Sequence, residues 1–202
     1  GTDYSSSEIL HWDGSAWSAT AIGGDIIVRA IWGFGPSDVW AVGYVSLSDP
    51  RILHYDGTSW TVAYAPAMSG WGALYGLWGS SASDVWAVGN MVVSSAYQPL
   101  VLHFDGTSWS EVDPGIEMAA QLQAVGGSSA SDVWIAAYDL EADNSVGIYR
   151  FNGSTWAAVD ASALPSIAIG DLWVATPSAA FFSGYRLMEN GNVSDRTVAR
   201  WN

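Results

Sequence analysis

One repeated pattern constrains the fold of this chain more than any other feature. Its clearest copy contains LWGSSASDVWAVG, which starts at Leu77, followed by LVLHFDGTSW, which starts at Leu100. The SDVWAVG part and its variants recur at steps of 46, 48 and 47 residues. These copies begin at Ser37, Ser83, Ser131 and Ser178. Four related units therefore occupy most of the 202 residues.

Each unit shows the pattern of four short β-strands separated by turns. In the clearest copy we predict strands a, b, c and d at 73–79, 85–90, 100–104 and 108–112. The a–b link GSSAS and the c–d link DGT carry Gly, Ser and Asp, which suit tight hairpin turns. Periods of about 40 to 50 residues with several strands each are typical of β-propellers, whose four-stranded sheets, the blades, surround a central channel.

The sequence predicts an all-β fold, a β-propeller of four blades with four antiparallel strands each. We expect a single domain over 1–202. Its expected units are a partial c–d unit at 9–30, followed by 31–63, 73–112, 121–159 and 167–202, the last with strands a, b and c. Seventeen strands result, so the N-terminal strands are expected to help close the ring. The alternative is that the segment belongs to a longer array or pairs with a second chain, because unpaired sheet edges invite pairing.

Aromatic residues recur at fixed places in the units and supply much of the expected core. The chain has 13 Trp and no cysteine, so neither a disulfide nor a thiolate metal site is available. We predict that two recurring sets are wedges between blades, because large aromatic side chains dominate burial. These sets are Trp17, Trp60, Trp109 and Trp156 in the c–d hairpins, and Trp40, Trp86, Trp134 and Phe181 in strand b.

The charge balance excludes some classes of partner. The formal net charge is −14, and the six basic residues are all arginine. Such a chain repels phosphate backbones and anionic membrane surfaces, so neither nucleic-acid binding nor membrane insertion is expected. The sequence has no apolar run of about 18 residues, and it shows no signal peptide.

The repeated phrases resemble the tryptophan-rich propeller repeats found in many copies in secreted or surface proteins of bacteria. The resemblance covers 9–202 and rests on the SDVWAVG and LHYDGTSW phrases. The c–d turn also resembles the Asp box of sialidases and sortilin-like proteins, here with Asp56, Gly57 and Trp60. This resemblance implies a scaffold with varied roles, located outside the cell, at the cell surface or in the periplasm.

The histidines suggest a metal site only at first sight. All three, His11, His54 and His103, precede the c–d turn of different units, so they are expected to lie far apart. We predict instead that strand c pairs with the aspartate of the a–b turn. The predicted pairs are Asp38 with His54, Asp84 with His103, and Asp132 with Arg150.

The repeated carboxylates could form the acid and base of a hydrolase, but their repetition favours a structural role. Glycoside hydrolysis needs one pair of carboxyl groups about 5–9.5 Å apart, whereas these aspartates recur in each unit. A sialidase-type hydrolase remains the enzymatic alternative. The sialidase resemblance implies an arginine cluster for the substrate carboxylate, whereas the six arginines here are mostly spread over separate units.

Function is predicted on one face of the propeller. The b–c and d–a links leave from this face and differ between units, and loops on a rigid scaffold commonly carry binding. Exposed aromatic rings can stack on sugar rings, and carboxylates can accept hydrogen bonds from sugar hydroxyls. The candidate ligand-binding residues are Trp71, Tyr97, Tyr138, Tyr185, Asp49, Glu117 and Glu189.

A calcium ion is a second hypothesis for this face. Asp139, Glu141 and Asp143 offer oxygen ligands at close spacing, as calcium prefers. The loop lacks the Gly and distal Glu of an EF-hand, so a solvated acidic loop is the alternative. No other cofactor is expected.

We therefore predict a non-catalytic module that binds a partner, a glycan or a surface protein, through the b–c and d–a links that differ between units. A structural or adhesive segment that completes a larger ring or a homo-oligomer through its terminal strands is the alternative, and a sialidase-type hydrolase is the third hypothesis.

Overall fold

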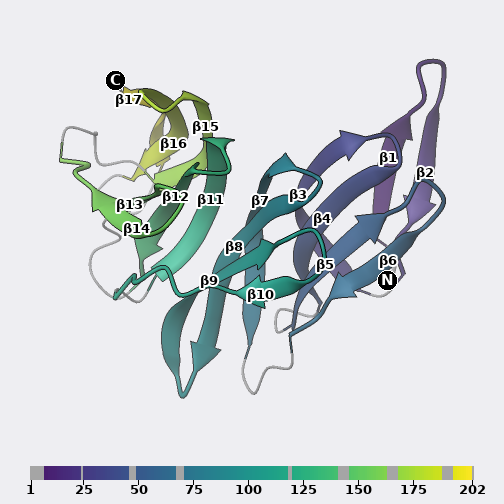
Figure 1. The fold of residues 1–202 in the computed structure, drawn as a ribbon, viewed down its shortest axis with the longest axis horizontal. Helices are drawn as coiled ribbons and strands as arrows, with labels where there is room; N and C mark the ends of the chain where they lie inside the picture. The colour runs from purple at the N-terminus through teal and green to yellow at the C-terminus, as the bar shows by residue number, and fades with distance from the viewer. Residues whose placement is uncertain are drawn as a thin grey trace.

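The computed structural model describes residues 7–23, 25–45, 49–66, 71–117, 120–140, 146–162, 168–187 and 193–201. These residues form antiparallel β-sheets that follow one another along the molecule, as Figure 1 shows. Nowhere in these ranges is there a helix long and apolar enough to cross a membrane.

The sheets follow the repeat. The first contains β1 (Glu8–Trp12) and β2 (Trp17–Ala21). The second contains β3 (Ile26–Gly35), β4 (Asp38–Val45), β5 (Asp49–Tyr55) and β6 (Trp60–Tyr64). The third contains β7 (Gly72–Ser81), β8 (Asp84–Val93), β9 (Ala96–Phe104) and β10 (Trp109–Glu111). The fourth contains β11 (Ala120–Ser129), β12 (Asp132–Asp139), β13 (Val146–Phe151) and β14 (Trp156–Val159). The last contains β15 (Ala168–Thr176), β16 (Ala179–Leu187) and β17 (Val193–Trp201).

This arrangement confirms the β-propeller class. Each complete blade is a four-stranded antiparallel meander, and strand a of one blade packs on the sheet before it. Thus β7 contacts β3, β4 and β5, and β11 contacts β7, β8 and β9. The cores lie between blades, because a twisted sheet with two apolar faces buries both only against its neighbours.

The predicted closure of a four-blade ring is wrong. The β1–β2 hairpin forms a sheet of its own, in register from Glu8 opposite Ala21 to Trp12 opposite Trp17, and within the described residues it is not hydrogen-bonded to β15–β17. Its Ile9 packs instead with Ile22 and Ile26 in a cluster that extends into the first complete blade. The two ends of the array lie at opposite ends of the molecule (Figure 1). The blades therefore form an open arc.

In the three complete blades the aspartate at the a–b turn pairs with strand c, as the sequence predicted. Asp84 accepts hydrogen bonds from Trp86 Nε1 (3.2 Å), and its Oδ1 lies 2.7 Å from His103 Nε2. Asp38 pairs with His54 in the same way at 2.8 Å. In the next blade Arg150 replaces histidine, and its Nε donates to Asp132 at 2.6 Å. Histidine and arginine are therefore interchangeable here as donors from strand c.

An aromatic clasp, formed by the aromatic residue of strand c and the tryptophan of strand d, holds neighbouring blades together. In the third sheet the clasp is Phe104 with Trp109, whose rings lie 4.9 and 5.4 Å from that of Trp40 in the preceding blade. In the fourth sheet Phe151 and Trp156 contact Trp86 of the third in the same way, at 5.4 and 5.5 Å. The predicted wedge role is confirmed at these contacts.

The wedge prediction is wrong for Trp17. Its clasp with Trp12 is intact, with ring centroids 5.6 Å apart, but 67% of Trp17 is exposed, against 9% of the equivalent Trp109. The reason is geometric, because within the described residues no strand-b tryptophan of another sheet contacts this clasp. Trp173 and Val198 in the last sheet are also exposed. Both ends of the arc thus present apolar surface of the kind that the inner blades bury.

The two hairpin turns of a blade lie against each other. Gly106, with φ of +92°, begins the c–d turn so close to the a–b turn that a Cβ on it would lie 2.7 Å from Ser83 Cβ. Gly57 and Gly153 repeat this contact. These turns form one face of each blade. The b–c and d–a links, which differ between units, consequently form the opposite face, here called the individual face.

Candidate binding site on the individual face

The b–c hairpin of the third sheet is longer than predicted, and it brings two candidate residues together. β8 continues to Val93 and β9 begins at Ala96, so only Ser94 and Ser95 form the turn. Both have positive φ, 51° and 67°, as a two-residue hairpin turn of this twist requires. The segment predicted as a loop is therefore a two-stranded hairpin, with Tyr97 opposite Val92.

Trp71 is fixed beside this hairpin by its backbone. It directly precedes β7, and its carbonyl oxygen accepts a hydrogen bond of 2.7 Å from the N–H of Val92. Its indole ring lies 5.3 Å from the Tyr97 ring at an interplanar angle of 88°. Because 41% of Trp71 remains exposed, this perpendicular pair presents an aromatic surface to solvent.

A cleft of about 750 Å³ adjoins the aromatic pair. One wall is the start of β9, including Tyr97, and the other is the end of β10 with the link that follows, including Glu117. Asp113 shapes this link, because its carboxylate accepts the N–H of Gly115 at 2.8 Å, while Ile116 is buried beneath. The structure therefore places two candidate residues, Tyr97 and Glu117, on this cleft, and Trp71 beside it in contact with Tyr97.

The cleft is acidic and open. Glu111, Asp113 and Glu117 line it, and all three are exposed. The chemistry available is stacking on the aromatic pair and acceptance of hydrogen bonds by carboxylates. That combination suits a neutral, hydroxyl-rich ligand and disfavours an anionic one.

The other candidate residues do not line this cleft. Asp49 begins β5 and forms an ion pair with Arg51, Oδ2 to Nη2, at 2.9 Å. The hydroxyl of Tyr138 donates to the Ile169 carbonyl at 2.6 Å, and burial raises its pKa well above the ordinary value, so Tyr138 joins β12 to β15. Tyr185 is exposed on β16. Glu189 lies outside the described residues.

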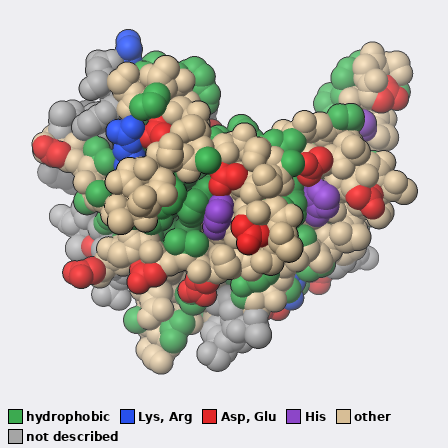
Figure 2. Space-filling view, viewed as in Figure 1, with side chains coloured by type: hydrophobic (Ala, Val, Ile, Leu, Met, Phe, Trp, Pro, Cys, Tyr) green, Lys and Arg blue, Asp and Glu red, His purple; other side chains and the backbone are tan. Residues whose placement is uncertain are grey.

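The described residues form no group that could hold a metal ion. Across the described ranges, no three histidine, aspartate or glutamate side chains are grouped so that they could hold a metal ion. Of the calcium hypothesis only Asp139 is described, whereas Glu141 and Asp143 lie outside these ranges. Figure 2 shows histidines at separate places on the surface, and His54 and His103 are paired within their own blades.

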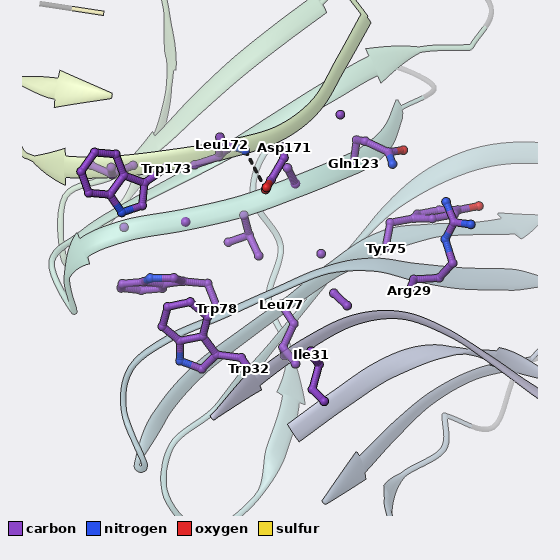
Figure 3. A pocket seen from close by; sticks show the side chains of 18 residues that line it. Arg29, Ile31, Trp32, Tyr75, Leu77, Trp78, Gln123, Asp171, Leu172 and Trp173 are labelled. Carbon is purple, nitrogen blue, oxygen red and sulfur yellow. Dashed lines mark hydrogen bonds between the residues drawn. The ribbon is translucent and has the colours of Figure 1, made fainter. Parts of the chain in front are cut away.

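A second concavity lies on the inner wall of the arc, and sequence reasoning missed it. Strands β3, β7, β11 and β15 line a cavity of about 630 Å³ (Figure 3). Each inner strand has a β-bulge at the same point of the repeat. The residues at these bulges are Arg29, Tyr75, Gln123 and Gly170. The signal was present, because this position differs in every unit while its neighbours repeat.

Comparisons with known proteins identify the fold. No protein-family model matches the chain, and no curated protein sequence matches it. Among solved structures, YCF48 bound to D1 peptide is 18% identical, with a TM-score of 0.55 over 89% of this chain and 56% of that one. The six-bladed fucose-binding lectin of Aleuria aurantia is 13% identical, with a TM-score of 0.59 over 91% and 66%. The GH74 xyloglucanase of Xanthomonas campestris is 14% identical, with a TM-score of 0.56 over 91% and 31%.

The lengths of these solved structures can be compared with that of the arc. The chain spans at most 66% of the length of these three structures. Because 66% of a six-bladed ring corresponds to about four blades, the array matches part of a larger ring. At such identities the likeness shows the β-propeller fold alone.

Proposed function

We propose that this chain is a non-catalytic propeller module that binds a glycan through the cleft beside Trp71 and Tyr97. The exposed perpendicular pair of aromatic rings next to an acidic cleft is the observation that carries the proposal. An aromatic ring covers the apolar face of a sugar, while Glu111 and Glu117 accept hydrogen bonds from its hydroxyls.

The fold supports the proposal at a coarse level. The fungal lectin with the same fold recognises fucose, so a propeller can serve as a carbohydrate-binding scaffold. The described arginines favour binding over sialidase-type hydrolysis, because Arg51 and Arg150 are paired with carboxylates of their own blades. A secreted or surface location fits a glycan-binding module and belongs to the same proposal.

Substitution of Trp71 tests this function. We expect the native protein to bind on an array of neutral oligosaccharides that includes fucosides, and Trp71→Ala to weaken binding about tenfold or more. The unfolding temperature should change little, because Trp71 is partly exposed and outside the blade interfaces. Binding is measured by calorimetry with the best array ligand, and folding by circular dichroism.

Trp17→Ala is the matched control. It removes an exposed tryptophan from β2, which does not line the cleft, so it should leave affinity unchanged. The proposal is wrong if no oligosaccharide binds, or if Trp71→Ala binds as tightly as the native protein.

A second candidate function is assembly, favoured by the apolar ends of the arc. Leu10, Trp12 and Trp17 are exposed at one end, and Trp173 and Val198 at the other. A further blade with the same clasp would cover these surfaces. Light scattering during size exclusion tests this candidate, because a monomer of 21.4 kDa at high concentration would contradict self-assembly.

A further inference from the structure

In the three complete blades the repeated bulge places one non-repeating side chain on the wall of the inner cavity. An extra residue in one strand bends it and re-aims the side chain at that point. Three successive inner strands have Arg29, Tyr75 and Gln123 at their bulges, and all three residues line the same cavity. In β15 the bulge residue is Gly170, and the next residue, Asp171, lines the cavity. Figure 3 shows Arg29, Tyr75 and Gln123 on one side of the concavity, with Asp171 nearer its middle.

Arg29 is the arginine that lines this cavity, and it forms no ion pair with a described carboxylate. Arg51 and Arg150 form ion pairs, and Arg200 lies over Phe181 in the last blade. The Arg29 guanidinium lies 5.6 Å from the centre of the Tyr75 ring. In the described part of the chain, no carboxylate lies within ion-pair distance of it. In a chain of net charge −14, this leaves a positive group facing a cavity without a protein anion on it.

The polar groups around Arg29 retain hydrogen-bonding capacity. Gln121 donates its amide to Gln123 Oε1 at 2.8 Å, which fixes the Gln123 side chain and leaves its NH2 group as a donor. One oxygen of Asp171 accepts the N–H of Leu172 at 2.8 Å, so the other oxygen can accept from a ligand. The hydroxyl of Tyr75 can both donate and accept.

The far part of the cavity is aromatic. Trp32, Trp78 and Trp173 line it, and Figure 3 shows them away from Arg29. Trp173 stacks on Phe181 but is still 64% exposed, so part of its ring surface is available. The cavity thus offers one cation, separated hydrogen-bonding groups and an apolar ring surface within about 630 Å³, a volume within the usual range for small-ligand sites.

We propose that this inner wall is a second binding site, specific for an acidic sugar such as a uronate at the end of an oligosaccharide. The guanidinium of Arg29 binds the carboxylate through two parallel hydrogen bonds. Gln123 and Asp171 bind hydroxyl groups, and the next sugar ring lies toward Trp173. The site is separate from the cleft at Trp71 and does not depend on it.

A matched pair of disaccharides tests the proposal. Cellobiose and its acid, which carries a glucuronate in place of the terminal glucose, differ in one carboxylate. We expect the acidic disaccharide to bind about tenfold more tightly than the neutral one in calorimetry at low salt, and to weaken in about 0.5 M salt. Equal affinity of the two disaccharides, or no binding by the acid, would overturn the proposal.

Variants locate the site. Arg29→Gln should lower affinity for the acidic disaccharide about tenfold or more, and because Arg29 is exposed it should unfold at the native temperature. Arg51→Gln is the matched control and should bind like the native protein, since Arg51 is paired with Asp49 on β5. Equal losses in both variants would mean a general charge effect and would refute the site, as would an unchanged affinity in Arg29→Gln. Trp71→Ala should retain the acidic ligand, which separates this proposal from the cleft.

Discussion

In three of the four c–d turns an aspartate, Asp13, Asp56 or Asp105, closes the turn with a single carboxylate oxygen. Asp105 Oδ1 accepts the backbone N–H groups of Thr107 and Ser108 at 2.8 and 2.9 Å. These hydrogen bonds, the one from Ser108 first, lower the pKa of Asp105 below its ordinary value of 3.8. The equivalent Asp13, which also accepts from a serine hydroxyl, has a pKa of about 2.

This arrangement predicts a loss of stability in acid. A carboxyl group whose pKa is lowered on folding stabilises the folded state fully above its unfolded pKa, and this contribution is lost as the pH falls through the folded pKa. Asn152 makes the same two contacts, each at 3.0 Å, without ionising. We therefore expect Asp105→Asn to fold, with a stability that falls less steeply between about pH 5 and about pH 3 than that of the native protein. Urea unfolding at both pH values measures this, and parallel losses would contradict it.

At the scale of the element, the aromatic clasp accounts for the cohesion of the blades. The clasps of the third and fourth sheets close on the strand-b tryptophan of the blade before them, so their contribution depends on that neighbour. Trp109 and Trp17 occupy the same place in the repeat, but among the described residues the Trp109 ring contacts the preceding blade and the Trp17 ring contacts only that of Trp12. The same residue type in the same local structure should therefore have different energetic roles.

Alanine substitution of these two residues measures the contact between blades. Trp109→Ala should cost about 3–5 kcal/mol of unfolding free energy, as expected for a buried tryptophan. Trp17→Ala should cost about 1 kcal/mol or less, the value of its contact with Trp12. Chemical unfolding of both variants gives the comparison, and similar losses would show that the clasp acts within its own hairpin.

The strands and turns could be predicted because their residues repeat, whereas the residues of the two candidate binding sites do not repeat. The turn residues, the His54 and His103 pairs and the strand-b tryptophans recur, so each copy supports the interpretation of the others. The bulge at Arg29 could not be predicted, because an extra residue inside this strand leaves the pattern of apolar residues almost unchanged. The contact of Trp71 with Tyr97 joins residues from two links, and the length of the Ser94–Ser95 hairpin that creates it depends on backbone conformation.

At the scale of the whole molecule, the closure of the ring could not be derived from the repeat. The strand count and the order of the sheets follow from local sequence, whereas the number of blades depends on the angle between neighbours. That angle arises from many contacts, such as those of β11 with β7, β8 and β9, and no single residue encodes it. In the open arc, the contacts between blades repeat, whereas the residues on the exposed faces differ from blade to blade.

The central claim is that repeated tryptophans build the scaffold while Trp71 binds. The chain provides the probe, because its 13 tryptophans each carry an indole N–H that heteronuclear NMR can resolve. We would titrate the protein with the best neutral oligosaccharide from the array and follow all the indole signals. The account predicts a large shift of the Trp71 signal and unchanged signals from Trp86, Trp109 and Trp134. An unshifted Trp71, or shifts centred on the buried tryptophans, would contradict it.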